Sequence, residues 1–171
     1  MHTLQYIAIS DVEDKEAAAR AVENLLNEEL NPGHSWYDWF VVGGGRFNPD
    51  QSKQYDDDYE AVISYADTPD IFDEKLLQSQ QAKGKEYQEL YIDYKLNKEE
   101  IEKIFENWNG DMEFSMSLYP LRKMLDIVQG HWDYTTRLYD ITHWSTNTHH
   151  MNRSIANGNK NWFLVPIDFH F

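Results

Sequence analysis

The chain is organised around one aromatic stretch, Ser35-Trp36-Tyr37-Asp38-Trp39-Phe40-Val41-Val42-Gly43-Gly44-Gly45-Arg46-Phe47. It combines aromatics around one aspartate, two valines, three glycines, an arginine and a last aromatic. Strand periodicity places Trp36, Asp38, Phe40 and Val42 on one face and Tyr37, Trp39 and Val41 on the other. Because both faces are bulky, we expect a strand that is covered on both sides or curls into an interface, and that ends at the glycines.

The composition predicts one intracellular domain covering residues 1–171. The chain has 171 residues and no cysteine, which excludes disulfides, thiol catalysis and cysteine-bound metal. No apolar run approaches the roughly 20 residues that span a bilayer. Residues 1–5 lack the basic and apolar regions of a signal peptide. We therefore expect a cytoplasmic protein without a membrane partner.

The net charge of −15 is unevenly distributed along the chain. Residues 1–110 hold 24 acidic and 10 basic residues, whereas residues 111–171 hold 6 and 5. So acidic a chain repels phosphates, and we expect no direct binding to nucleic acid. The acidity could simply provide a solvated face. The asymmetry also fits an acidic face that docks on a basic groove as a nucleic-acid mimic.

The first third of the chain predicts a strand–helix–strand–strand unit, which is half of a ferredoxin-like sheet. Residues 4–10 are apolar and suit a first strand. Apolar residues then recur at helical spacing over residues 11–30, before the Asn-Pro-Gly of residues 31–33. Residues 59–66 have the composition of a third strand. We expect an α+β fold with a ferredoxin-like antiparallel sheet packed with helices.

The middle of the chain predicts a helical insertion. A helix should begin at Pro69 with Thr68 as its cap, and Gly84 should interrupt it. Helical patterns follow over residues 97–108 and 120–129. Beyond them, residues 132–144 are rich in strand formers, residues 145–161 read as a loop, and residues 162–171 form a strong strand. Pro166 predicts that this last strand lies at an edge or carries a bulge.

The glycine turn is a candidate ligand-binding site composed of Gly43, Gly44, Gly45 and Arg46. Its flexible backbone and adjacent cation could hold a phosphate or a carboxylate. No lysine-serine pair follows, as a phosphate-binding loop would need. The alternative is a tight bend whose arginine pairs with a structural acid.

Three residues are candidates for acid–base chemistry. Asp168 and His170 lie two positions apart on the terminal strand, so both should project from one face. A carboxylate beside an imidazole can orient it for proton transfer. Since ferredoxin-like sheets bring the first and last strands together, Asp38 and Arg46 could converge on this pair. The alternative is a solvated strand edge.

A histidine-rich region offers weak metal candidates, namely His131, Asp133, His143 and His149, with His150 beside them. A divalent metal needs three or four such groups converging at about 2 Å from one point. No H-x-x-x-H or H-E-x-x-H motif arranges them on a helix. We therefore expect no metal and no cofactor.

Residues 38–47, Asp38-Trp39-Phe40-Val41-Val42-Gly43-Gly44-Gly45-Arg46-Phe47, resemble an uncharacterised family of small bacteriophage proteins. That family carries a W-D-W-Y-x-x-G-G-R-W pattern after a strand–helix unit and ends in a strand with Asp-x-His, which Asp168-Phe169-His170 matches. The likeness covers roughly the first 65 residues and the last ten. This chain has one more glycine, and Phe47 replaces the final tryptophan. The resemblance implies a phage origin and a ferredoxin-like core, and it brings no established activity.

These observations predict a non-enzymatic accessory or anti-defence protein of bacteriophage type. It would bind and inhibit a host or defence protein through its acidic surface. The alternative is a small nucleotide-ligand-binding protein or phosphate-ester hydrolase that uses Asp38, Arg46, Asp168 and His170. A third interpretation, a structural module, would form homo-oligomers.

Overall fold

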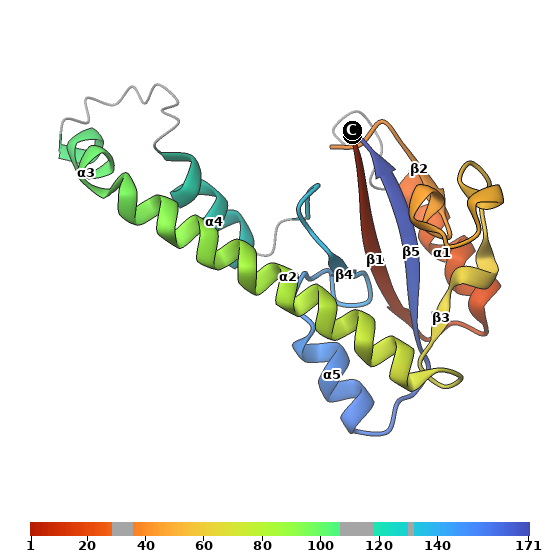
Figure 1. Cartoon of the computed structure of the whole chain (residues 1–171). Coiled ribbons are helices and arrows are strands. Elements are labelled where there is room, and N and C mark those ends of the chain that lie inside the picture. Colours follow the sequence, from red (N-terminus) through yellow and green to blue (C-terminus); the bar gives the residue numbers. More distant parts are fainter. Residues whose placement is uncertain (29–35, 107–117, 130–131) are drawn as a thin grey trace. The chain divides into compact units, whose positions relative to one another are not determined.

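The computed structural model describes residues 1–28, 36–106, 118–129 and 132–171 (Figure 1). The chain divides into two compact units, and the division falls within one helix. The first unit comprises Met1–Ser79 and Trp132–Phe171, and the second comprises Gln80–His131.

The first unit contains a mixed five-stranded sheet. Its strands are β1 (His2–Ser10), β2 (Trp39–Val42), β3 (Ile63–Ser64), β4 (Leu138–Asp140) and β5 (Trp162–His170). The strand order is β2-β5-β1-β4, and β3 pairs with β5 beyond the end of β2. β5 runs antiparallel to β1 along the whole of both strands, whereas β4 runs parallel to β1 (Figure 1). The predicted α+β class is confirmed. A ferredoxin-like arrangement is not, because the two central strands here are antiparallel neighbours.

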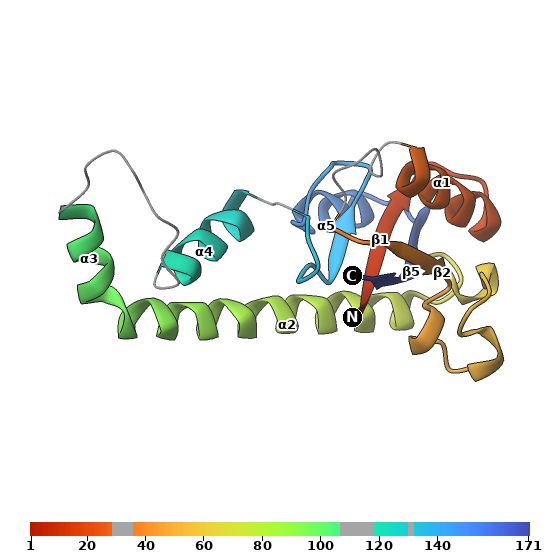
Figure 2. The same ribbon diagram turned by 90° about the horizontal axis from the view of Figure 1, so that it is seen from above.

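Helices pack on both faces of this sheet. α1 (Lys15–Glu28) covers one face, with Val22 and Leu26 against Phe163 and Phe169. The start of α2 (Pro69–Leu96) and α5 (His149–Ala156) cover part of the other face, around Trp162. Figure 2 shows α1 and the start of α2 on opposite sides of β1 and β5. Each face therefore has its own apolar core.

α1 begins four residues later than the sequence predicts. Asp11 has a left-handed backbone with φ of 63°, which an α-helix does not allow. The Asp14 side chain instead accepts the Ala17 N–H at 2.8 Å and caps the helix.

The second unit is helical in its described residues. It contains the later part of α2, α3 (Lys98–Glu106) and α4 (Tyr119–Gln129). The predicted break at Gly84 is wrong, because α2 continues through it for twelve more residues. One glycine costs a helix only about 1 kcal/mol, which the surrounding helix formers offset.

Three strand and loop predictions need correction. Residues 59–66 contain a short 3₁₀ turn and only the two-residue β3. Residues 145–161, predicted as a loop, contain α5, whose His149 N–H is accepted by the Asn147 side chain. β2 begins only at Trp39, so the predicted alternation of faces fails before it. Tyr37 consequently packs in the same core as Phe40.

Pro166 lies in a central strand rather than at an edge. It is opposite Tyr6 of β1, and its carbonyl accepts the Gly43 N–H on the other side at 2.8 Å. Its nitrogen faces that same side, between the residues that pair with β2 and those that pair with β3. The missing N–H therefore interrupts no ladder, and the proline is tolerated without a bulge.

Candidate functional site

Three strand segments bring the predicted acid–base residues to one end of the sheet. The register places His2 of β1 and Trp39 of β2 on either side of His170. Asp168 lies two residues before His170 on β5, on the same face of the sheet. It pairs with Leu4 of β1 on one side and with Val41 of β2 on the other. Pairing of β2 with β5 brings Asp38 next to His170 and the Arg46 backbone N–H to Asp168, whereas pairing of β1 with β5 adds His2.

Asp168 is fully buried and bonded on two sides. Its carboxylate accepts the Arg46 backbone N–H at 3.0 Å and lies 2.9 Å from Nδ1 of His2. A Cβ on Gly45 would lie only 2.6 Å from Oδ2 of Asp168, and Gly45 has a φ of +48°. Both the lack of space for a Cβ and the left-handed backbone therefore require a glycine at position 45.

The glycine turn does cradle an anion, but that anion is the Asp168 carboxylate of the same protein. The Arg46 N–H, which a bound phosphate would need, is already donated to it. The Arg46 side chain is exposed, whereas Gly43, Gly44 and Gly45 are buried. Gly43 lies against Asp58, and the Asn48 amide group bonds both the Gly43 carbonyl and the Asp58 carboxylate. The turn is therefore fixed to the loop that follows it.

His2 belongs to this site and was missed from the sequence. The expected first strand started at Leu4, two residues too late, so His2 had no assigned strand partner. Antiparallel alignment of the two terminal strands could have revealed it, because that alignment places His2 opposite His170. Since the Asp168 carboxylate accepts hydrogen bonds, we assign the proton of a neutral His2 imidazole to Nδ1. Its Nε2 is then an acceptor.

His2, Trp39 and His170 form a cluster of rings that we call the ring corner. Trp39 stacks on His170 with 5.0 Å between centroids and an interplanar angle of 10°. The His2 ring stands edge-on to both, at 5.3 Å and 76° to Trp39 and at 5.0 Å and 67° to His170. Asp38 borders the corner, with Oδ2 at 3.3 Å from Nδ1 of His170 but without hydrogen-bond geometry. The Asp38 side chain is 71% exposed.

The histidine-rich region forms a different arrangement. Nδ1 of His143 lies 2.8 Å from Oδ2 of the fully buried Asp140, and the His143 ring stacks on His150. Asp133 accepts the N–H and the hydroxyl of Thr135 in a turn. Among the residues that the structure describes, no three histidine or acidic side chains are grouped as metal ligands. His131 lies outside the described residues.

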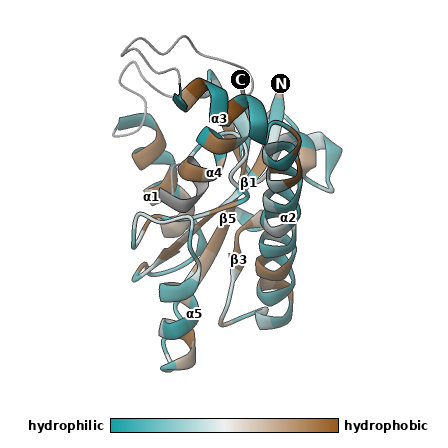
Figure 3. Cartoon of the chain, turned by 90° about the vertical axis from the view of Figure 1, so that its left-hand side faces the viewer, coloured by the Kyte–Doolittle hydropathy of each residue, from teal (hydrophilic) through white to brown (hydrophobic). Residues whose placement is uncertain are grey.

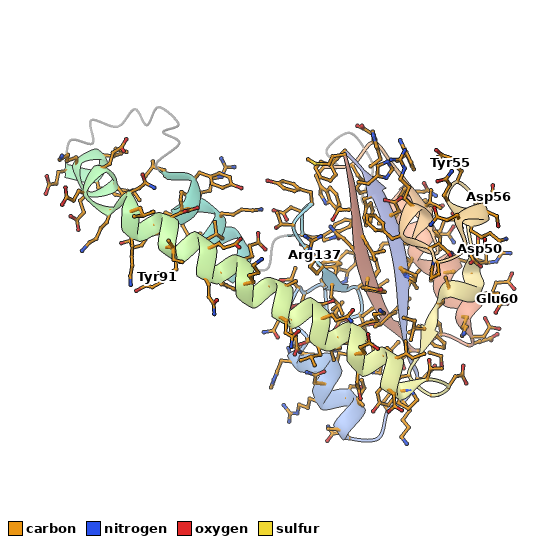
Figure 4. The ribbon with its side chains drawn as sticks, in the orientation of Figure 1. Asp50, Tyr55, Asp56, Glu60, Tyr91 and Arg137 are labelled. Carbon is orange, nitrogen blue, oxygen red and sulfur yellow. The ribbon has the colours of Figure 1, made fainter. Side chains whose placement is uncertain are left out.

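A second surface, which we call the acidic rim, lies on the loop between β2 and β3. It consists of Asp50, Asp56, Asp57 and Glu60 on the same loop as Tyr55, which is 65% exposed. Figure 4 shows Asp50, Tyr55, Asp56 and Glu60 on this side of the molecule. Hydrogen bonds from the Ser52 hydroxyl and N–H lower the pKa of Asp50. Partial burial raises the pKa of Asp57, and nearby carboxylates of Glu23 and Asp56 raise it further. The four carboxylates outnumber Lys53, the basic residue of this stretch that acts on Asp50, so the rim is negative.

The chain was compared with models of protein families, with curated proteins and with solved structures, and none of them matches it. Within the described residues, no helix combines the length and apolarity that a membrane span requires. The helices drawn in Figure 3 mix hydrophilic and hydrophobic residues along their length.

Proposed function

We propose that this protein acts by binding a positively charged partner protein through the acidic rim. The observation that carries the proposal is an exposed Tyr55 on a loop that also presents four exposed acidic residues, three of which Figure 4 labels. Tyrosine is enriched among the residues that dominate binding energy in protein interfaces. Carboxylates around such an anchor steer a basic partner toward it and repel nucleic acid.

The internal bonding of the loop supports the same function. Asp50 accepts the Ser52 N–H and hydroxyl, Asp57 accepts the Val42 N–H at 2.8 Å, and Asn48 bonds Asp58. A surface already held in one conformation loses little conformational entropy on binding. The resemblance to small bacteriophage proteins predicts that the partner is a host or defence factor, which the protein would inhibit by covering a nucleic-acid-binding groove.

The test compares two variants with the same change in charge. Asp56→Asn/Glu60→Gln removes two of the four rim charges, and Glu99→Gln/Glu100→Gln removes two exposed charges on α3. Each protein is immobilised and exposed to the heparin-binding fraction of a bacterial lysate. We expect the wild type and the α3 variant to retain a partner that added double-stranded DNA displaces, and the rim variant to lose it. Equal capture by both variants, or no capture, contradicts the proposal.

A second candidate function is a nucleotide-ligand-binding protein or phosphate-ester hydrolase that uses Asp38, Arg46, Asp168 and His170. The observation that favours it is the convergence of these residues at one sheet end. Here His170 would transfer protons, and the exposed Arg46 side chain would meet the phosphate. A thermal-shift screen with nucleotides and cyclic dinucleotides tests it, since a ligand that binds only the folded state raises its stability. Arg46→Ala should abolish the shift. A shift that persists in this variant, or no shift at all, argues against the candidate.

A further inference from the structure

The rings of the ring corner lie in two nearly perpendicular planes. Trp39 and His170 are parallel, and His2 stands at 76° and 67° to them. Trp39 is 39% exposed although it lies in a strand. Indole faces carry negative electrostatic potential, which attracts a cation placed above them.

Two carboxylates lie against the histidines of the ring corner, and the N-terminal ammonium of Met1, bonded to the Phe171 carbonyl, lies one residue from His2. The exposed Asp38 carboxylate borders His170, and the buried Asp168 carboxylate lies behind His2. The Arg46 backbone N–H, which could have donated a hydrogen bond to an incoming anion, is donated to Asp168. A phosphate approaching Trp39 therefore meets the exposed Asp38 carboxylate, whereas a cation is attracted by that carboxylate and by the Trp39 ring.

We propose that the ring corner with Asp38 binds an organic cation, namely a guanidinium or alkylammonium group on a side chain of the partner protein. The inference rests on the proposed function and deepens it, because it identifies what the basic partner presents. Trp39 supplies the ring and Asp38 supplies the charge, while His170 stacks on the indole and the His2 ring lies nearly perpendicular to it. Asp168 is a positioning residue, because it fixes the orientation of His2.

Probes of defined chemistry test this site in ¹⁵N,¹³C-labelled protein at pH 8. The cations are tetramethylammonium and N-acetylarginine amide, the neutral isostere is tert-butanol, and the anions are inorganic phosphate and AMP. The readouts are the indole N–H signal of Trp39 and the ring C–H signals of His2 and His170. We expect both cations to produce saturable shifts confined to these signals, while the isostere and the anions produce none.

Substitutions then assign the contributions. Trp39→Leu should weaken binding of the cations by about two- to fivefold, the range that an exposed cation–π contact gives. Asp38→Asn should weaken it by up to about fivefold, and the loss should shrink as salt is added. Trp144→Leu, which removes another exposed tryptophan, is the matched control and should bind as the wild type does. Asp38→Asn keeps the test valid if Trp39→Leu fails to fold.

The outcomes separate this site from the acidic rim. Asp56→Asn/Glu60→Gln should leave the binding of tetramethylammonium unchanged, and Trp39→Leu should weaken capture of the basic partner. If capture depends on the rim but not on Trp39 or Asp38, the proposed function stands and this inference is wrong. Stronger shifts with phosphate or AMP, equal shifts with tert-butanol, or no shifts also overturn it. Spermidine binding tenfold more tightly than N-acetylarginine amide would identify a free polyamine as the ligand and refute a partner side chain.

Discussion

Gly45→Ala is the sharpest test of how the glycine turn and Asp168 are joined. The added Cβ would lie 2.6 Å from Oδ2 and 2.7 Å from Cβ of Asp168, whereas ordinary contacts begin at 3.4 Å. The Asp168 carboxylate must therefore retreat by about 0.8 Å, the difference between 3.4 and 2.6 Å. Its hydrogen bond from the Arg46 N–H, now 3.0 Å long, would then exceed hydrogen-bond distance.

The expected destabilisation has two parts. An alanine at the left-handed φ of Gly45 costs about 1–2 kcal/mol. Loss of a buried hydrogen bond to a charged group costs about 1.5–3 kcal/mol more. The variant should thus lose about 2.5–5 kcal/mol of unfolding free energy, which lowers Tm by about 5–20 °C for a chain of this size.

Gly158→Ala is the matched control, because Gly158 also has a positive φ, of +97°, but a Cβ there would contact nothing within 4 Å. Urea unfolding followed by tryptophan fluorescence gives the free energy for both variants. Gly45→Ala should cost at least 1 kcal/mol more than Gly158→Ala. Equal costs would show that only backbone strain matters and would refute the tight contact with Asp168.

Three other substitutions test single features. Tyr37→Phe removes a 2.8 Å hydrogen bond to the Leu26 carbonyl and should cost about 1 kcal/mol in urea unfolding at pH 7. Burial raises the pKa of Tyr37 to about 12, above its value of about 10 when unfolded, so its stabilisation is lost as pH rises from 10 to 12 and the gap to the variant should narrow there. Gly84→Ala, at an open position within α2, should stabilise the helical unit by about 1 kcal/mol, measured by circular dichroism during unfolding. Pro166→Ala should cost less than about 1 kcal/mol in urea unfolding, because the regained N–H faces a gap between strands and only the entropy of the unfolded chain changes.

The sequence was informative where strands are long and apolar. β1, α1 and β5 were all predicted within a few residues, because periodicity and composition agree over their length. The predicted approach of Asp168 to the glycine turn was inferred from pairing of the first and last strands, whereas in the structure it follows from pairing of β2 with β5. Periodicity could not predict which side chain binds the backbone N–H groups of the glycine turn. The sequence left open whether the turn holds an external anion or pairs with a structural acid, and in the structure the Arg46 N–H is donated to Asp168.

Short elements and chain ends account for the remaining differences. β3 has two residues, too few for a periodic pattern, and its position depends on pairing with Leu164 and Phe163. α5 begins in a run of asparagine, threonine and histidine that is typical of loops, and Met151 holds it in the core. His2 precedes the first apolar residue of its strand. In each case a tertiary contact outweighs local propensity.

β5 pairs with three of the other four strands, and it follows all of them in the chain. During translation, residues 1–161 take about 8–30 s to emerge at 5–20 residues per second. β1 has no antiparallel neighbour during that time, and the apolar faces of β1 and α1 stay without the strand that covers them. Closing the sheet then pairs His2 with His170. Contacts between residues so far apart in the sequence raise the contact order, which slows folding. The same strand that assembles the site therefore also delays completion of the sheet until β5 has been synthesised.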